Sequence, residues 1–283
     1  MKRDRARVLW LAVVGLLGAL VLISAAWVSE SAPVPKALWA WEGPQSQVLD
    51  TAVEDGFTSI FLYAPPGFSD DPSYATFVAD ANESGIEVWA LGGEPFWARE
   101  QAPFEEWARE ATESELFVGL APDVEPWALP GWESEQRQES LIDSYLIGLG
   151  AVASETHLPV NAAVPFWFDE IDHVDGDVSW TLIESVMDRV DMVSVLAYRD
   201  TASGEDGIVA LVEDELAYAA RAGIEVVVAV ETAPITPEKV TFAEEGRAFL
   251  YEELSHVSEE LRDDPSLAGL AVHDHENYSR LAE

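Results

Sequence analysis

A single residue separates Asp123 from Glu125, and both follow shortly after an apolar run at residues 116–120. In an extended segment alternate side chains point to the same side, so the two carboxylates are expected to share one pocket. Two carboxylates this close disfavour each other's ionisation, and one is pushed to keep its proton near neutral pH. That is the state a general acid needs. The pair predicts acid catalysis by Glu125, tuned by Asp123; the alternative is two surface carboxylates near a helix start.

Glu231 is a third candidate carboxylate, and it follows another largely apolar run at residues 225–230. A carboxylate in this position is expected either to face the end of the sheet or to be paired, for instance with Arg199. In a barrel of eight strands, the fourth and the seventh lie roughly opposite each other. Glu231 is then expected to face Glu125 across a bound sugar, as a nucleophile about 5 to 5.5 Å from the acid/base.

The elements that must position these residues alternate along the chain. Eight short apolar runs are separated by longer amphipathic segments, a pattern typical of parallel strands joined by helices. No glycine-rich phosphate turn follows the first run, so a closed (β/α)8 TIM barrel is favoured over an open doubly wound sheet. Strands are predicted at residues 37–41, 59–63, 87–91, 116–120, 159–164, 192–197, 225–230 and 268–272. Helices are predicted at 45–55, 74–84, 103–112, 134–155, 180–189, 207–222 and 243–262, with a very short eighth helix in the last eleven residues.

Polar and aromatic side chains cluster at the ends of the predicted strands, where barrels of this kind build their active sites. Tyr198 follows the sixth run and is predicted to act as a polar stabiliser. Large flat rings are costly to expose unless something stacks on them, and sugars offer apolar faces for this. The alternative for any one ring is packing under a loop. The predicted substrate-binding residues are Trp41, Glu42, Glu94, Trp97, Trp127, Trp167, Asp200, His273, Asp274 and His275.

These residues resemble two groups of barrel glycoside hydrolases. Glu125 and Glu231 are similar to the acid/base and nucleophile that retaining enzymes place after strands four and seven, although Val124 stands where those enzymes usually have Asn. Asp123-Val124-Glu125 and the sequence LAYRD at 196–200 also resemble the chitinase-like family 18 hydrolases, without their full D-x-x-D-x-D-x-E run or their eighth-strand Trp. In that family a tyrosine after strand six supports attack by an N-acetyl group of the substrate. Both resemblances imply that Glu125 is the acid and that a polysaccharide or oligosaccharide is the substrate.

Two other functions stay open at the level of the sequence. The barrel could bind a sugar without cleaving it, or it could be a metal-dependent hydrolase that uses Asp123, His273 and His275. Barrel hydrolases of the amidohydrolase kind have His-x-His after the first strand, where this chain has Trp39 and Trp41. We therefore predict no metal site and no organic cofactor.

The N-terminus carries a membrane-insertion signal. Four basic residues within residues 2–7 precede 21 uncharged residues at 8–28, enough to cross a hydrocarbon layer of about 30 Å. The basic residues predict that the N-terminus stays inside. Residues 1–28 are expected to be a signal anchor or, with small residues at 24–26, a cleaved signal peptide. A linker at 29–36 then leads to a barrel domain at 37–283, which is expected to be extracytoplasmic.

The charge of the chain excludes one class of partner. Asp and Glu number 53 against 15 Lys and Arg, which gives a net charge of −38. Such a surface repels nucleic acid, so no nucleic-acid partner is predicted. Solubility of a secreted surface explains the acidity, and adaptation to high salt is the alternative. The chain has no cysteine, so its core must be sufficient without disulfides.

Overall fold

The computed structural model describes residues 34–175 and 178–283. The predicted membrane segment 1–28 lies outside this part of the chain, as does the predicted linker up to residue 33. Within the described residues, no helix is both long enough and apolar enough to cross a membrane. The membrane attachment and the extracytoplasmic location therefore stay predictions.

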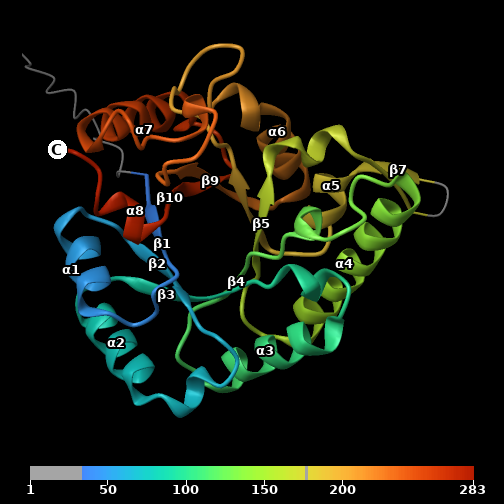
Figure 1. The fold of residues 1–283 in the computed structure, drawn as a ribbon, viewed down its shortest axis with the longest axis horizontal. Helices are drawn as coiled ribbons and strands as arrows, with labels where there is room; N and C mark the ends of the chain where they lie inside the picture. Colours follow the sequence, from blue (N-terminus) through green and yellow to red (C-terminus); the bar gives the residue numbers. More distant parts are fainter. Residues whose placement is uncertain (1–33, 176–177) are drawn as a thin grey trace, which may run out of the picture. The chain divides into compact units, whose positions relative to one another are not determined.

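Eight parallel strands form a ring at the centre of the described chain (Figure 1). Neighbours in the ring follow one another in the sequence, and β1 pairs with β10. A parallel bridge between Leu120 and Val160 joins β4 to the residue before β5 and closes the ring. The strands are β1 (Lys36–Ala40), β2 (Ser59–Tyr63), β3 (Glu87–Gly92), β4 (Leu120–Pro122), β5 (Asn161–Pro165), β8 (Met192–Leu196), β9 (Glu225–Glu231) and β10 (Leu267–His273). The predicted (β/α)8 TIM barrel is confirmed.

Helices surround the ring on its outer side (Figure 1). Their ends follow local signals: Asp71 caps α2 by accepting a hydrogen bond from the backbone N–H of Ser73, and α6 ends at Gly223, whose φ is 77°. The α-helices are α1 (Ser46–Glu54), α2 (Pro72–Glu83), α3 (Gln101–Glu113), α4 (Glu135–Glu155), α5 (Leu182–Met187), α6 (Glu213–Ala222), α7 (Arg247–Leu261) and α8 (His275–Tyr278). The last of them has four residues, as the short C-terminal segment requires.

Two apolar clusters lie on the two faces of the ring. The inner cluster fills the ring and includes Trp39, Phe61 and Trp89, whereas the outer cluster packs Leu38 and Ile60 among the residues of the helix layer. Neighbours such as Leu38 and Trp39 belong to different clusters because successive side chains of a strand point to opposite faces. Burial of both faces explains why the strands are almost continuously apolar. Every second residue therefore points into the ring, up to the end of each strand.

The fourth strand begins later than the sequence predicts. The apolar run covers residues 116–120, whereas β4 spans Leu120–Pro122. Leu116 and Phe117 pack into the outer cluster, so their apolarity reports burial outside the ring; hydrogen bonds to β3 begin only with the backbone of residues 118 and 119. As a result, Asp123 follows directly after the last residue of the strand.

A two-stranded antiparallel hairpin, β6 (Asp172–Asp175) and β7 (Val178–Thr181), is missing from the sequence-based prediction. Its sequence is largely polar, and the search for strands relied on apolar runs. Trp180, predicted to begin a helix, belongs to β7 instead. Helix α5 begins only at Leu182, after a capping box in which Thr181 and Glu184 exchange hydrogen bonds.

Candidate active site

Six inward-facing side chains meet at the carboxyl-terminal end of the ring, which we call the mouth. Each lies two residues beyond a member of the inner cluster, so the alternation of the strand directs it inward. Three of them, Trp41, Tyr63 and Tyr198, pack against that cluster. The six residues are Trp41, Tyr63, Asp123, Tyr198, Glu231 and His273, which follow Trp39, Phe61, Ala121, Leu196, Ala229 and Ala271.

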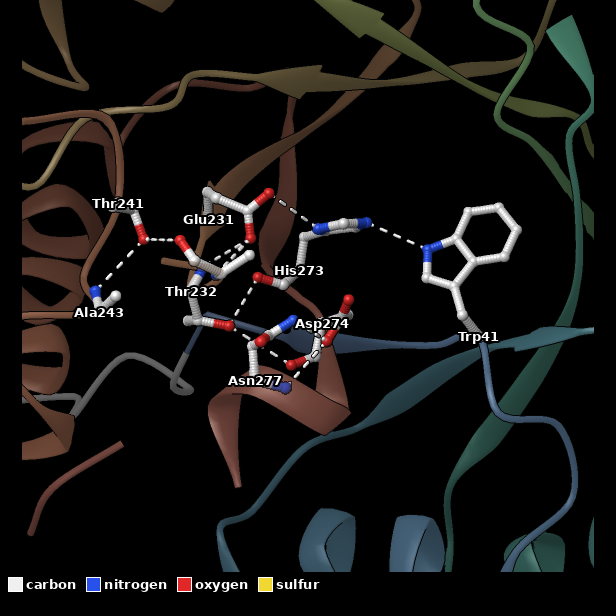
Figure 2. A network of polar contacts seen from close by, with 9 residues as sticks. Trp41, Glu231, Thr232, Thr241, Ala243, His273, Asp274 and Asn277 are labelled. Carbon is white, nitrogen blue, oxygen red and sulfur yellow. Dashed lines mark hydrogen bonds and ion pairs between the residues drawn. The ribbon is translucent and has the colours of Figure 1, made fainter. Parts of the chain in front are cut away.

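Glu231, the last residue of β9, is 4% exposed and has polar contacts on both carboxylate oxygens (Figure 2). Its Oε1 accepts hydrogen bonds from the backbone N–H groups of Thr232 and Ala233, each at 2.7 Å. Its Oε2 lies 3.0 Å from Nδ1 of His273, the neighbour of Glu231 in the register of β9 and β10. N–H donors favour the charged form of a carboxylate. The burial of Glu231 is therefore compensated.

His273 lies between Glu231 and Trp41. The indole Nε1 of Trp41 is 3.0 Å from Nε2 of His273, and an indole nitrogen can only donate. Nε2 must therefore accept, which puts the proton of the neutral imidazole on Nδ1, facing Glu231. Burial disfavours the charged form of His273. The hydrogen bond to Glu231 and the neighbouring carboxylates outweigh this effect and raise the pKa of His273 above its usual value.

Asp123 is buried at the mouth. Burial raises the pKa of Asp123; His273 opposes this rise and the charge of Glu231 adds to it. The loop after β3 approaches so closely that a Cβ on residue 93 would lie 2.0 Å from the carbonyl oxygen of Asp123, which explains Gly93. Nε1 of Trp39 faces the carboxylate of Asp123 and lowers its pKa, against the effect of burial. Within the described chain, neither this nitrogen nor Oδ1 of Asp123 has a hydrogen bond of full geometry, and both atoms are buried.

Glu125 lies two residues beyond Asp123, at the start of the short 3₁₀ helix η3 (Pro126–Ala128). Burial, and then the charge of Asp123, raise the pKa of Glu125 to about 7, against the opposing effect of His273. A carboxyl group with this pKa holds its proton on a large fraction of molecules at neutral pH. It is therefore suited to both donating and accepting a proton there.

The phenol of Tyr198, two residues beyond the end of β8, lies among the carboxylates of the mouth. Its ring centroid is 6.2 Å from that of His273. Burial raises the pKa of Tyr198 well above its usual value, and four carboxylates raise it further: Glu231, Asp123, Glu125 and Asp274. The structure thus brings together all four residues that the sequence predicts as catalytic.

Three further predicted residues are held by partners beside the mouth. Nδ1 of His275 lies 2.6 Å from Oε1 of Glu42, and its Nε2 lies 3.3 Å from Oγ1 of Thr51. Burial alone would raise the pKa of Glu42, but the contact with His275 outweighs it and the pKa is lowered. Asp274 caps α8 by accepting a hydrogen bond from the backbone N–H of Asn277 at 3.0 Å. These contacts fix the short segment that follows β10.

The imidazoles of His273 and His275 have a partner at each ring nitrogen. A metal site built on Asp123 and these two residues would first have to break those contacts. Among the residues that the structure describes, no group of three or more His, Asp or Glu side chains is arranged to hold a metal ion.

Asp200 and Glu94 differ in their neighbours. The pKa of Asp200 is raised by burial and by Glu253 of α7, against Arg199, so Asp200 belongs to a charge cluster near α7 and not to the group around Tyr198. Glu94 follows β3 and adds to the effect of burial in raising the pKa of Tyr63. Of the two, Glu94 is the one whose charge acts on a residue of the mouth.

Trp97 is the predicted substrate contact that the structure corrects. Its side chain is only 2% exposed and is stacked on Phe104 of α3, with ring centroids 5.3 Å apart and planes at 14°. The short helix η2 (Pro95–Ala98) turns the residue down into the helix layer. Trp97 therefore stabilises the outer core and is not available at the mouth.

Trp127 and Trp167 are half-buried and join the loops after β4 and β5. Their ring centroids lie 5.6 Å apart in an edge-to-face arrangement, and both rings also contact Phe168. Trp41 is tilted against Tyr63, with centroids 5.3 Å apart. Sequence reasoning missed Tyr63, although the strand alternation that carries Asp123 inward from Ala121 would have identified it.

A cavity of about 450 Å³ lies at the opposite end of the ring. Its lining includes Lys36, Glu87 and Glu225, the first residues of β1, β3 and β9. None of the predicted site residues lines it. It is therefore separate from the mouth.

Several solved glycoside hydrolases resemble this chain in structure, whereas no protein-family model and no curated protein matches its sequence. The GH113 β-mannanase from Alicyclobacillus acidocaldarius superimposes with a TM-score of 0.55 at 12% identity, over 86% of this chain and 87% of that one. A GH18 chitinase from Pseudoalteromonas aurantia gives 0.54 at 11% identity, over 86% and 96%. A chitinase from Chromobacterium violaceum gives 0.52 at 10% identity, over 86% and 95%. The chain therefore has a glycoside hydrolase-like (β/α)8-barrel fold.

Proposed function

We propose that this chain is a glycoside hydrolase that cleaves a polysaccharide or oligosaccharide at the mouth of the ring. The observation that carries the proposal is the gathering of Asp123, Glu125 and Glu231 around the phenol of Tyr198. This group lies at the strand ends where (β/α)8 enzymes build their active sites.

Glu125 is the proposed general acid and base. Its raised pKa lets it hold a proton near pH 7, and this proton passes to the glycosidic oxygen as the bond from that oxygen to C1 breaks. Asp123 supports this role because its charge raises the pKa of Glu125. We assign to the hydroxyl group of Tyr198 a hydrogen bond donated to the reacting sugar.

Glu231 is the proposed nucleophile. Its carboxylate attacks C1 as the leaving oxygen takes the proton of Glu125, and a water activated by Glu125 then releases the sugar. The N–H donors around Glu231 favour the ionised form that attack requires. In the chitinase-like alternative an N-acetyl group of the substrate attacks C1, and Glu231 only orients its neighbours.

The test is hydrolysis of a glycan panel that contains β-mannan and chitin, chosen because a β-mannanase and a chitinase resemble this chain in structure. With a substrate found, Glu125→Gln should lower kcat by a factor of about 10² to 10⁴, the usual contribution of a general acid. Glu133→Gln, in the exposed part of the same loop, is the matched control and should retain full activity. A Glu125→Gln enzyme with wild-type kcat would refute the assignment.

Binding of a sugar without cleavage is the second candidate function. It is favoured by the contacts of Glu231, because both carboxylate oxygens already have partners. In this case no glycan of the panel is hydrolysed, yet at least one binds, and Trp127→Ala weakens that binding.

The proposal includes an extracytoplasmic location, with residues 1–28 as an anchor or a signal peptide. The 21 uncharged residues after a basic N-terminus support it. Protease added to intact cells should digest the barrel of an anchored protein. A barrel that is protected in intact cells and digested only after lysis would contradict this location.

A further inference from the structure

We propose that Trp41 is a positioning residue that holds the carboxylate of Glu231 in place through His273. The inference rests on the proposed role of Glu231 at the mouth. Trp41 lies just beyond β1, whereas Glu231 ends β9, and His273 on β10 lies between them (Figure 2). Three strands that are neighbours in the ring thus contribute one residue each to a single chain of hydrogen bonds.

The direction of each hydrogen bond follows from the donor of Trp41. Its indole N–H can only donate, so Nε2 of His273 accepts and Nδ1 donates to Oε2 of Glu231. Glu231 then receives three N–H donors, two from the backbone and one from His273. These hydrogen bonds allow only one tautomer of the neutral imidazole. If its proton were on Nε2, that N–H would face the indole N–H of Trp41.

A second proton on His273 would break the hydrogen bond between its Nε2 and the indole N–H of Trp41. The doubly protonated imidazole has an N–H at Nε2, which opposes the N–H of the indole. The carboxylates of Glu231, Asp123 and Asp274 favour that proton, as their effect on the pKa of His273 shows. The indole N–H of Trp41 thus opposes the second proton on His273. The rings of Tyr198 and Trp39 complete the surroundings, with centroids 6.2 and 5.9 Å from the imidazole.

The arrangement also links Glu231 to the wall of the mouth. The ring of Trp41 is half-buried: its N–H donates to His273, and the ring also packs against Tyr63 at the mouth. A sugar that stacks on Trp41 would contact the residue that fixes the nucleophile. Substrate binding and the orientation of Glu231 would then depend on one side chain.

The experiment follows the titration of His273 by NMR in the full-length protein labelled at the histidine Cε1 positions. The chain has five histidines, and His273→Gln assigns the signal of interest. Trp41→Phe keeps an aromatic ring and removes the N–H, so it should raise the pKa of His273 by about one pH unit, the value of one hydrogen bond. Trp180→Phe, in the hairpin of β6 and β7, is the matched control and should leave this pKa unchanged. An unchanged pKa in Trp41→Phe would overturn the proposal.

A second readout needs no substitution. In the wild-type protein, the indole N–H signal of Trp41 should shift with pH at the same midpoint as the Cε1 signal of His273, because the two atoms share one hydrogen bond. If no indole signal titrates with that midpoint, the proposal is wrong. This holds even if Trp41→Phe fails to fold.

Activity separates the inference from the proposed function. If a substrate is found, the acidic limb of the pH profile of kcat should move upward in Trp41→Phe by the same amount as the pKa of His273, while Trp180→Phe keeps the wild-type profile. If the acidic limb of kcat stays in place while the pKa of His273 moves, the hydrogen bonds that run from Trp41 through His273 do not act on Glu231. A moved pKa with no hydrolysis of any glycan would retain the hydrogen-bonded chain and reject the hydrolase.

Discussion

Two glutamates are buried in this protein under opposite conditions. Glu231 at the mouth is 4% exposed and is met by N–H donors on both oxygens, whereas Glu215 on α6 is 1% exposed. Within the described residues, neither carboxyl oxygen of Glu215 has a hydrogen-bond partner. Burial raises the pKa of Glu215 to about 8, and Asp169 of the short helix η4 (Phe166–Glu170) adds to the rise.

A buried carboxylate can take part in chemistry only where donors stabilise its charge. At the mouth the ends of β9 and β10 supply donors, so a negative charge can persist where a substrate would meet it. Between α6 and η4 the described residues supply only the backbone N–H of Glu215 itself, which lowers the pKa of Glu215 too little to offset burial. The carboxyl group then keeps its proton, or the fold bears the cost of the charge. The same residue type therefore serves chemistry in one place and reduces stability at high pH in the other.

Removal of the Glu215 charge should change the stability of the protein most. The folded pKa of this acid lies above its unfolded value, so the folded state binds more protons and the stability of the wild type falls as the pH rises from about 4.5 to about 8. Glu215→Gln removes the ionisation and should raise the free energy of unfolding at pH 9 by on the order of 4 kcal/mol. Urea denaturation at pH 4 and pH 9 measures this, and the gain should be small at pH 4. Glu213→Gln, exposed on the same helix, is the control; an equal gain in both variants would contradict the explanation.

Glu231→Gln should instead lower the free energy of unfolding. The new amide N–H₂ either faces Nδ1–H of His273 or opposes the backbone donors, so a buried network loses part of its bonding. The free energy of unfolding at pH 7 should fall by about 2 to 3 kcal/mol, the range for hydrogen bonds to charged groups. Equilibrium denaturation beside the Glu133→Gln control gives the value. A loss below about 0.5 kcal/mol would mean that the donors do not stabilise the charge, and the comparison with Glu215 would fail.

Asp123→Asn tests whether the carboxylates of the mouth affect one another. Burial makes the largest contribution to the raised pKa of Glu125, and the charge of Asp123 adds to it. Without that charge the pKa of Glu125 should fall, so the alkaline limb of kcat/KM should move to lower pH by about one unit. At pH 8 this corresponds to about a tenfold loss of kcat/KM. An unmoved limb in a folded variant would remove Asp123 from the tuning of Glu125.

The smallest expected effect concerns the support behind Glu231. The hydroxyl group of Thr232 donates to the carbonyl oxygen of His273 at 2.8 Å and ties β9 to β10 at the mouth. Thr232→Val should lower the free energy of unfolding by about 1 kcal/mol. Thr76→Val removes a comparable hydrogen bond on the exposed side of α2 and should cost less than about 0.5 kcal/mol. Equal losses of stability of the two variants in thermal unfolding would show that the hydrogen bond of Thr232 at the mouth stabilises the fold no more than one on the surface.

The sequence predicted the ring and most of the mouth because both follow from burial. Strands buried on two faces are apolar throughout, and this apolarity located seven of the eight strands closely. It misplaced the start of β4, since Leu116 and Phe117 are buried in the outer cluster before strand pairing begins. It missed the hairpin of β6 and β7 because those two strands are largely polar.

Contacts between distant residues were beyond such reasoning. Strand ends and the alternation of side chains indicated Asp123, Tyr198 and Glu231, but Trp97 stands at a strand end as well and is turned into the helix layer by η2. The pairing of Glu42 with His275 joins residues 233 positions apart, which no local pattern encodes. Glu215 looks like any acidic residue of a surface helix until the packing of α6 is known.

The chain enters the ring at Lys36, in the lining of the cavity at the end opposite the mouth. Glu125 and Glu231 lie at the other end of the ring. A substitution at the start of β1 is therefore expected to act on the base of the barrel and to leave the surroundings of these two carboxylates unchanged.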